Sequence, residues 1–198
     1  MESKNVKIEV ADPTVLGLFG LAIVTFVASS QKLGWTDGLA YVLPWAIFLG
    51  GLAQLIASMF DFKHKNLFGA TAFSAYGLFW MGMAMGWFIK LGCFGETLAA
   101  AADLKQLGFV FLGYAILTLV FVISGLKMSK AMFFLLVLIM ILFIGLAMDA
   151  FGCGALWHSI AAVSELMIAL LTFYVLAAKY LHGFFGKEML PVGKPFMK

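Results

Sequence analysis

Arginine is absent from this sequence of 198 residues, cysteine and histidine are rare, and only 12% of the residues are charged. The two cysteines and three histidines lie far apart, so no segment has the spacing of metal ligands. The chain also lacks a Walker loop, a GxGxxG motif and an HExxH motif. These absences exclude the common nucleotide-dependent and zinc-dependent enzymes, and we expect no catalytic residue, no metal and no cofactor.

Positive charge is sparse as well. The formal net charge is +3, and the lysines are spread along the chain rather than gathered in one patch. A domain that binds nucleic acid typically carries a concentrated basic surface. We therefore expect no nucleic-acid partner.

Hydrophobic residues make up 64% of the chain, far above their share in a soluble globular domain. They form long uncharged runs, each sufficient to cross a hydrocarbon core of roughly 30 Å as a helix. The sequence predicts an all-α integral membrane protein whose six transmembrane helices form a bundle. The six runs are 13–31, 38–60, 66–89, 106–126, 131–148 and 150–178, the last interrupted by His158 and Glu165.

These runs leave room for one domain only. We expect a short N-terminal segment at residues 1–12, a transmembrane pore domain at 13–182 and a C-terminal tail at 183–198. The tail mixes aromatic and basic residues. It therefore either lies along the membrane surface or packs beneath the bundle.

The lysines predict the orientation. Only Lys32, Lys90 and Lys105 fall on the side opposite the termini, whereas the other ten of the 13 basic residues fall on the side that both termini share. Basic residues concentrate on the cytoplasmic side of membrane proteins. Both termini are therefore expected in the cytoplasm, with the protein in the plasma membrane.

Small and polar residues interrupt the second run. Gln54 is the most informative, because a buried amide without partners costs several kcal/mol in hydrocarbon. Ala46, Gly50, Gln54 and Ser58 recur at intervals of four, which predicts one face of an α-helix. Two interpretations remain: a packing seam in which Gln54 binds a backbone carbonyl, and a passage between the first three helices. Polar residues of the first and third helices would share that passage: Thr25, Ser29, Thr71, Ser74 and Tyr76.

Three segments resemble one known family. The opening DPTVLGL (residues 12–18) is similar to its N-P-A-P-L-G-L motif, with Asp12 in place of Asn and Val15 in place of the second Pro. The central segment GGLAQLIASMFDFKHKNLFGATAFSAYGLFW (residues 50–80) closely resembles the family's stretch from G-G-x-A-Q to F-G-x-T-A-F-x-x-Y-G-x-F-W. The segment FGKEMLPVG (residues 185–193) resembles the F-G-x-x-x-L-P-x-G tail. Together they resemble the acetate uptake transporter family, the group of succinate–acetate permeases.

The resemblance implies a pore within each protomer and a hexamer of protomers. It implies passage of acetate and other short monocarboxylates, in some members also succinate, by proton symport or through a channel. A narrow apolar constriction is expected from Leu21, Tyr76 and Ile139, with Leu21 where the family commonly has Phe. Gln54 belongs to the family's motif on the second helix, which favours a pathway role. Its amide would donate to a passing carboxylate, helped by the hydroxyls of Thr71, Ser74 and Tyr76.

Ionisable residues lie inside the last run. His158, Glu165 and Thr172 recur at intervals of seven and so lie near one face of a helix. Ionisable groups within a membrane are functional hypotheses by default. Glu165, with Thr172, either relays a proton or sets specificity, or else Glu165 pairs with a neighbouring helix or lines an outer vestibule. The family usually has a small residue at the position of Glu165, so the resemblance does not imply this acid.

Cys93 and Cys153 both fall on the expected outer side, next to glycines. They either form a disulfide, which an external compartment permits, or remain thiols that pack as small apolar residues.

Three functions fit these observations. The first is a transporter or channel for acetate and similar small carboxylates, whose other partners are the lipid bilayer and further copies of the chain. The second is a pore for small neutral molecules such as urea or short amides. The third is a membrane scaffold or sensor that transports nothing. The sequence also leaves open whether a carboxylate crosses as the anion or after it has taken up a proton.

Overall fold

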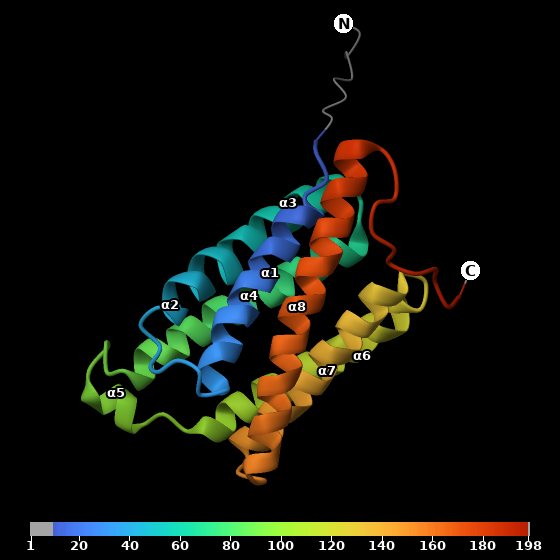
Figure 1. Ribbon diagram of the computed structural model, residues 1–198. Coiled ribbons are helices and arrows are strands. Elements are labelled where there is room, and N and C mark those ends of the chain that lie inside the picture. Colours follow the sequence, from blue (N-terminus) through green and yellow to red (C-terminus); the bar gives the residue numbers. More distant parts are fainter. Residues whose placement is uncertain (1–9, 198) are drawn as a thin grey trace, which may run out of the picture.

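A computed structural model describes residues 10–197, which form helices and no strand (Figure 1). Six spans within this range are long and apolar enough to cross a membrane, as predicted. The second span is built from three consecutive helices, and α5 is a short helix between spans. The elements are α1 (Thr14–Lys32), α2 (Val42–Trp45), η1 (Ala46–Ala53), α3 (Gln54–Lys63), α4 (Leu67–Lys90), α5 (Glu96–Ala100), α6 (Leu104–Gly125), α7 (Lys130–Ala150) and α8 (Ala155–Phe185).

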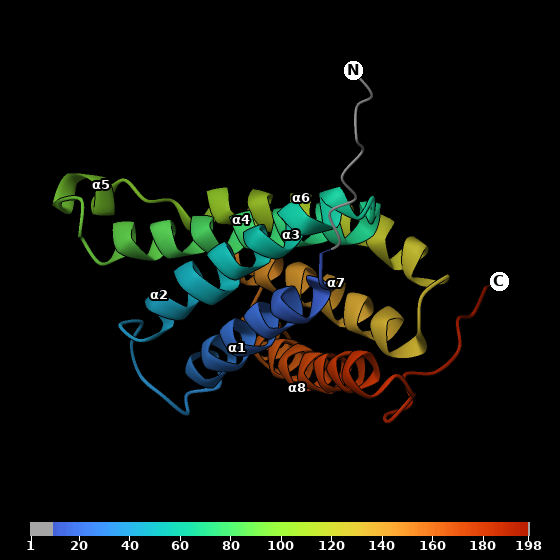
Figure 2. The ribbon, with the colours of Figure 1, turned by 90° about the horizontal axis from the view of Figure 1, so that it is seen from above.

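The six spans pack side by side in a closed ring. Helix α1 packs between α8 and the η1–α3 segment, α3 packs on α4, and α7 packs between α6 and α8. The ring closes where side chains of α6 reach α4: Tyr114 donates a hydrogen bond to the carbonyl of Ala75 at 2.9 Å. Figures 1 and 2 show α1 and α8 side by side, with the start of α1 and the end of α8 at the same end of the bundle.

Local sequence signals explain where several spans begin. The Asn66 side chain accepts a hydrogen bond from the backbone N–H of Gly69 at the start of α4. Ser129 accepts one from Met132 at the start of α7. Such side chains satisfy N–H groups that have no partner within the helix. The spans can therefore start abruptly at the membrane surface.

The second span departs from the predicted α-helix. Residues Ala46–Ala53 form a π-helix, which is wider than an α-helix and is often found at functional sites. All four residues of the small-and-polar stripe are nonetheless buried: Ala46, Gly50, Gln54 and Ser58. Two glycines of neighbouring spans face this segment, because a Cβ on Gly20 would lie beside the carbonyl oxygen of Leu49 and a Cβ on Gly77 beside that of Gly51. Small residues thus allow three spans to approach closely.

The C-terminal tail packs against the end of the bundle, which is one of the two arrangements expected for it. Helix α8 continues to Phe185, and the chain then turns back toward the loop between α6 and α7. There the carbonyl of Val192 accepts a hydrogen bond from Ala131 at 3.0 Å, and the N–H of Met197 donates to Leu126 at 2.9 Å. The expected N-terminal segment 1–12 lies largely outside the described residues.

Candidate functional site

A small cavity lies at the centre of the ring. Its volume is about 20 Å³, which leaves room for on the order of one water molecule. The three residues predicted to form the constriction, Leu21, Tyr76 and Ile139, all line it, although they come from α1, α4 and α7. The complete lining is Leu21, Thr25, Tyr76, Phe79, Trp80, Ile139, Leu142, Phe143 and Ile168. The wall is therefore mostly apolar and aromatic, and the polar side-chain groups of its residues are the hydroxyls of Thr25 and Tyr76 and the indole N–H of Trp80.

Tyr76 is held firmly in this wall. Its hydroxyl forms a 2.9 Å hydrogen bond with that of Thr118 on α6, and its ring stacks on Phe143 with centroids 6.0 Å apart. Thr118 is fully buried and was missed by the sequence analysis. Its signal was a single threonine in a span that is otherwise almost wholly apolar. Because its hydroxyl already has this partner, Tyr76 presents mainly a ring face and edge to the cavity.

The predicted hydroxyl groups on α1 and α8 are buried, and each already donates a hydrogen bond to a backbone carbonyl of its own helix. Thr25 donates to the carbonyl of Leu21 at 2.7 Å, and Thr172 donates to that of Ile168 at 2.6 Å. Ser29 donates to the carbonyl of Phe26 at 2.9 Å. A hydroxyl that donates to its own helix still has lone pairs with which it can accept. These groups can therefore receive a hydrogen bond from a protonated acid without rearrangement.

Gln54 is not part of the cavity lining. Its side chain is 0% exposed and packs beside Gly20 and Gly77, in the seam between the first three spans. The amide nitrogen donates to the carbonyl of Gly50 at 2.9 Å, whereas Oε1 has no partner among the described residues. This is the geometry of the packing-seam interpretation, in which the amide satisfies a backbone carbonyl of the π-helix.

The structure does not bring Thr71 and Ser74 to the pathway either. They share the outer face of α4 with the exposed side chains of Leu67 and Leu78. Thr71 donates to the carbonyl of Leu67 at 2.8 Å. The helical period explains this arrangement, since Tyr76 lies on the opposite, buried face of the same helix.

A larger cavity of about 470 Å³ opens at the end of the bundle where α1 begins and α8 ends. Phe73 and Val175 are buried between it and the central cavity and belong to its wall. Its polar and charged lining residues are Thr14, Asn66, Ser129, Lys179, His182 and Glu188. Residues of the opening motif (Thr14) and of the tail motif (Leu190 and Val192) meet here. The sequence analysis did not predict this vestibule, although all three family motifs converge on it, since Asn66 and Phe73 belong to the central segment.

An ion pair stands at the mouth of the vestibule. Lys179 on α8 contacts Asp12 at 3.0 Å. Partial burial acts to raise the pKa of the Asp12 carboxyl, but hydrogen bonds from Thr14 and the Lys179 ammonium outweigh it and hold that pKa below its ordinary value. The resulting stabilisation is present above the ordinary carboxyl pKa and is lost as the pH falls through the lowered one.

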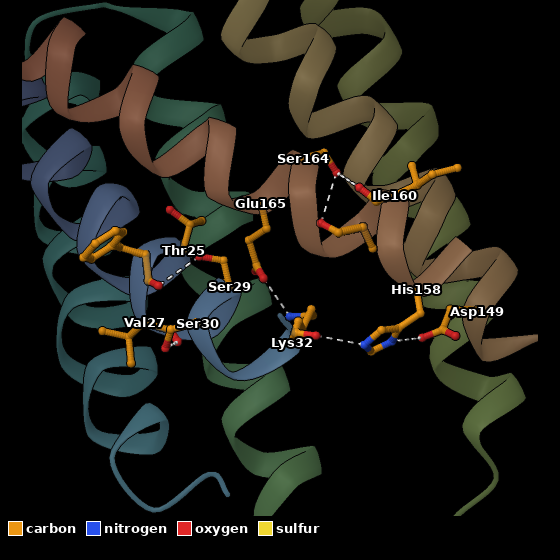
Figure 3. A network of polar contacts seen from close by, with 12 residues as sticks. Thr25, Val27, Ser29, Ser30, Lys32, Asp149, His158, Ile160, Ser164 and Glu165 are labelled. Carbon is orange, nitrogen blue, oxygen red and sulfur yellow. Dashed lines mark hydrogen bonds and ion pairs between the residues drawn. The ribbon is translucent and has the colours of Figure 1, made fainter. Parts of the chain in front are cut away.

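A second polar cluster lies at the end of the bundle opposite the vestibule (Figure 3). The Lys32 ammonium at the end of α1 contacts the Glu165 carboxylate of α8 at 2.8 Å. Glu165 therefore pairs with a neighbouring helix, one of the alternatives considered for it. Next to this pair, His158 contacts Asp149 through Nδ1 at 3.0 Å and the backbone carbonyl of Lys32 through Nε2 at 3.2 Å. Both of these partners accept hydrogen bonds, so the two bonds form together only when His158 carries both ring protons.

The structure corrects the possible disulfide. Cys93 and Cys153 are both free and exposed. The chain after Cys93 runs directly into α5, which both views place well away from the turn between α7 and α8 that carries Cys153. The glycines beside each cysteine serve these separate turns.

The cavities and the ion pair follow the same order along two antiparallel helices. Helix α1 passes from Thr14 in the vestibule through Leu21 in the central cavity to Lys32, and α8 runs in reverse from Glu165 through Ile168 to Lys179. Six membrane spans therefore surround two cavities that follow one another along α1 and α8. This arrangement is typical of a multi-pass membrane protein of the transporter and channel class. The model of the GPR1/FUN34/yaaH family matches residues 2–186, and the chain belongs to this family.

Individual relatives agree with this assignment. The chain is 31% identical over 190 residues to the succinate-acetate/proton symporter SatP of Escherichia coli K12, covering 94% of this chain and 97% of the relative. It is 34% identical over 151 residues to acetate permease A of Emericella nidulans, covering 73% of this chain and 49% of that one. The structure of the bacterial acetate channel SatP superposes with a TM-score of 0.86 at 28% identity, covering 93% of this chain and 100% of that chain. The family resemblance is thus confirmed, and the chain is a membrane transport protein rather than an enzyme.

Proposed function

We propose that this protein carries acetate and similar short monocarboxylates across the plasma membrane through a pore inside each protomer. The observation that carries the proposal is the central cavity, where Leu21, Tyr76 and Ile139 from three different spans meet. The vestibule lies on the same helices and gives the pore an entrance at the termini. The names of the relatives, a succinate-acetate symporter and an acetate permease, support the choice of substrate.

Under this proposal the structure represents the closed state of the pore. A cavity of about 20 Å³ is too small for acetate, which is several times larger than a water molecule. Passage therefore requires side chains of the wall, such as that of Leu21, to rotate. An apolar constriction of this width excludes hydrated ions by dewetting. No cation lines the central cavity, so a carboxylate is not trapped there.

Flux of labelled acetate into proteoliposomes tests the proposal. Vesicles that contain the purified protein should take up acetate faster than empty vesicles, and unlabelled propionate should compete while urea should not. Competition by urea would instead support the pore for small neutral solutes. If no solute moves faster than in empty vesicles, the chain is a scaffold or sensor and the proposal is wrong.

Replacing Leu21 with Ala should admit larger acids. Leu21 lines the central cavity, and truncation leaves a void because its neighbours relax only in part. We expect the ratio of butyrate to acetate uptake to rise several-fold. Leu16→Ala is the matched control, since Leu16 lies on the exposed face of the same helix. An unchanged ratio in Leu21→Ala would show that Leu21 does not set the width of the pore.

We also propose that the termini are cytoplasmic and that six protomers assemble, as the lysine distribution and the family resemblance suggest. The orientation has a direct test, because Cys93 and Cys153 are free, exposed and at the end opposite the termini. A membrane-impermeant maleimide should label the protein in intact cells. The Cys93→Ser/Cys153→Ser variant of the protein should remain unlabelled, since the chain has two cysteines in all. Labelling that appears only after permeabilisation would reverse the orientation.

A further inference from the structure

The ion pair between Lys32 and Glu165 is unusual in its burial. The Glu165 side chain is 1% exposed, whereas that of Lys32 is 16% exposed, and the two charged atoms lie 2.8 Å apart. A carboxylate inside a membrane span is costly unless a cation compensates it. Figure 3 shows that the Lys32 ammonium approaches Glu165 from the end of α1. The Glu165 carboxylate is therefore compensated by the Lys32 ammonium rather than by water, whereas the Lys32 side chain still reaches water.

The pair lies directly outside the central cavity. Glu165 precedes the cavity residue Ile168 by three positions on α8, which is less than one helical turn. Lys32 follows the cavity residue Thr25 by seven positions on α1, which is about two turns. The pair therefore lies between the outer end of these two helices and the central cavity.

No other ionisable group of the adjoining helices is free to serve Glu165. Helix α8 packs against α1 and α7. From α1 the facing group is Lys32, and from α7 it is Asp149, whose carboxylate contacts His158 of α8. His158 also holds the backbone carbonyl of Lys32, which fixes the end of α1. Within the described part of the chain, Lys32 is thus the one ion-pair partner of Glu165.

We propose that Glu165 is the proton donor that neutralises the substrate at the entrance to the central cavity, with Lys32 as its transient anchor. The incoming carboxylate replaces Glu165 on the Lys32 ammonium. The released Glu165 then has no cation beside it and takes up a proton, which arrives from the outer solution past the partly exposed Lys32. Glu165 then passes this proton to the substrate carboxylate and returns to Lys32. The neutral acid enters the apolar cavity. This inference rests on the proposed function.

The cycle balances and meets the demands of the cavity. One proton enters with each monocarboxylate, no other bond forms or breaks, and the ion pair ends in its starting state. Two carboxylic acids of similar intrinsic strength exchange a proton at little cost in free energy. The neutral acid can donate a hydrogen bond to Thr25, whose hydroxyl is already committed as a donor to Leu21. The apolar wall then no longer opposes a charge.

Acetate uptake under an imposed potential and under a proton gradient tests the proposal. Wild-type proteoliposomes, corrected for empty vesicles, should respond to an inward proton gradient but not to a potassium diffusion potential set by valinomycin. Glu165→Gln should lower the proton-driven uptake by on the order of 100-fold. Glu165→Asp should restore part of it. Glu96→Gln is the matched control, because Glu96 is exposed on α5 at the same end of the bundle.

A spectroscopic readout on the wild-type protein keeps the test independent of any variant that fails to fold. Binding of ¹³C-labelled acetate should produce the C=O stretch of a protonated carboxyl group from the unlabelled protein in the infrared difference spectrum. This band should be absent from Glu165→Gln. Wild-type uptake that follows the potential, or Glu165→Gln uptake that keeps its full proton dependence, would overturn the proposal. If wild-type vesicles move no more acetate than empty ones, the proposed function itself fails.

Discussion

Replacing Gly20 with Ala is expected to prevent the protein from reaching its native fold. A Cβ at this position would lie far inside van der Waals contact with the carbonyl oxygen of Leu49, a backbone atom of η1. A backbone atom cannot rotate away, so either α1 or the π-helix must shift. Overpacking in a well-packed core typically costs about 1–3 kcal/mol, and a clash with backbone lies at the upper end or beyond.

The readout is the elution profile and the melting temperature of the variant in detergent. Gly82→Ala is the matched control, since it makes the same change within α4 at a position with no heavy atom within 4 Å of the new Cβ. We expect Gly82→Ala to behave as wild type and Gly20→Ala to aggregate or to melt well below it. Equal melting temperatures would show that α1 and η1 do not approach as closely as described.

Replacing Lys32 with Met should destabilise the protein at least as strongly. The change removes the cation that compensates the buried Glu165 carboxylate. Removing one partner of a buried ion pair typically costs about 3–5 kcal/mol, because the remaining charge has no compensation. Lys90→Met is the matched control, since Lys90 ends α4 on the same side and is exposed.

The double variant Lys32→Met/Glu165→Met distinguishes the interaction between the two residues from the separate effect of each substitution. With both charges removed, most of the lost stability should return, since an apolar pair of similar volume is often neutral or stabilising. Melting curves of the two single variants, the double variant and the wild type give the coupling between the two residues. Additive effects would mean that Lys32 and Glu165 do not interact in the folded protein.

The spans themselves were predictable from the sequence. Length and composition are enough to recognise a long uncharged run as a transmembrane helix, because a helix satisfies every backbone polar group of a membrane span within that span. Leu21, Tyr76 and Ile139, the residues of the expected constriction, do line one cavity, but they were named through family resemblance rather than through periodicity. Nothing in the spacing of one span shows which residues of two other spans it will meet.

The differences from the expected site have a common physical cause. A family motif favoured a pathway role for Gln54, and Thr71 and Ser74 were added for their hydroxyl groups, yet neither signal shows which side of a helix faces the centre of the bundle. Gln54 lies instead in a seam that the π-helix and the close glycines create. The partner of Glu165 was equally hidden, since Lys32 is 133 positions away in the sequence. Such pairs depend on how the ring of helices closes.

The most direct measurement of the central claim is a thiol block of the cavity. In a Cys93→Ser/Cys153→Ser background, Ile139→Cys places one thiol in the central cavity, and Ile144→Cys places one on the exposed face of the same helix. A small methylthiolating reagent, added to the folded protein in proteoliposomes, should stop acetate uptake by Ile139→Cys, and excess acetate should slow the reaction. Ile144→Cys should be unaffected. Undiminished uptake by fully modified Ile139→Cys would contradict a pore through this cavity.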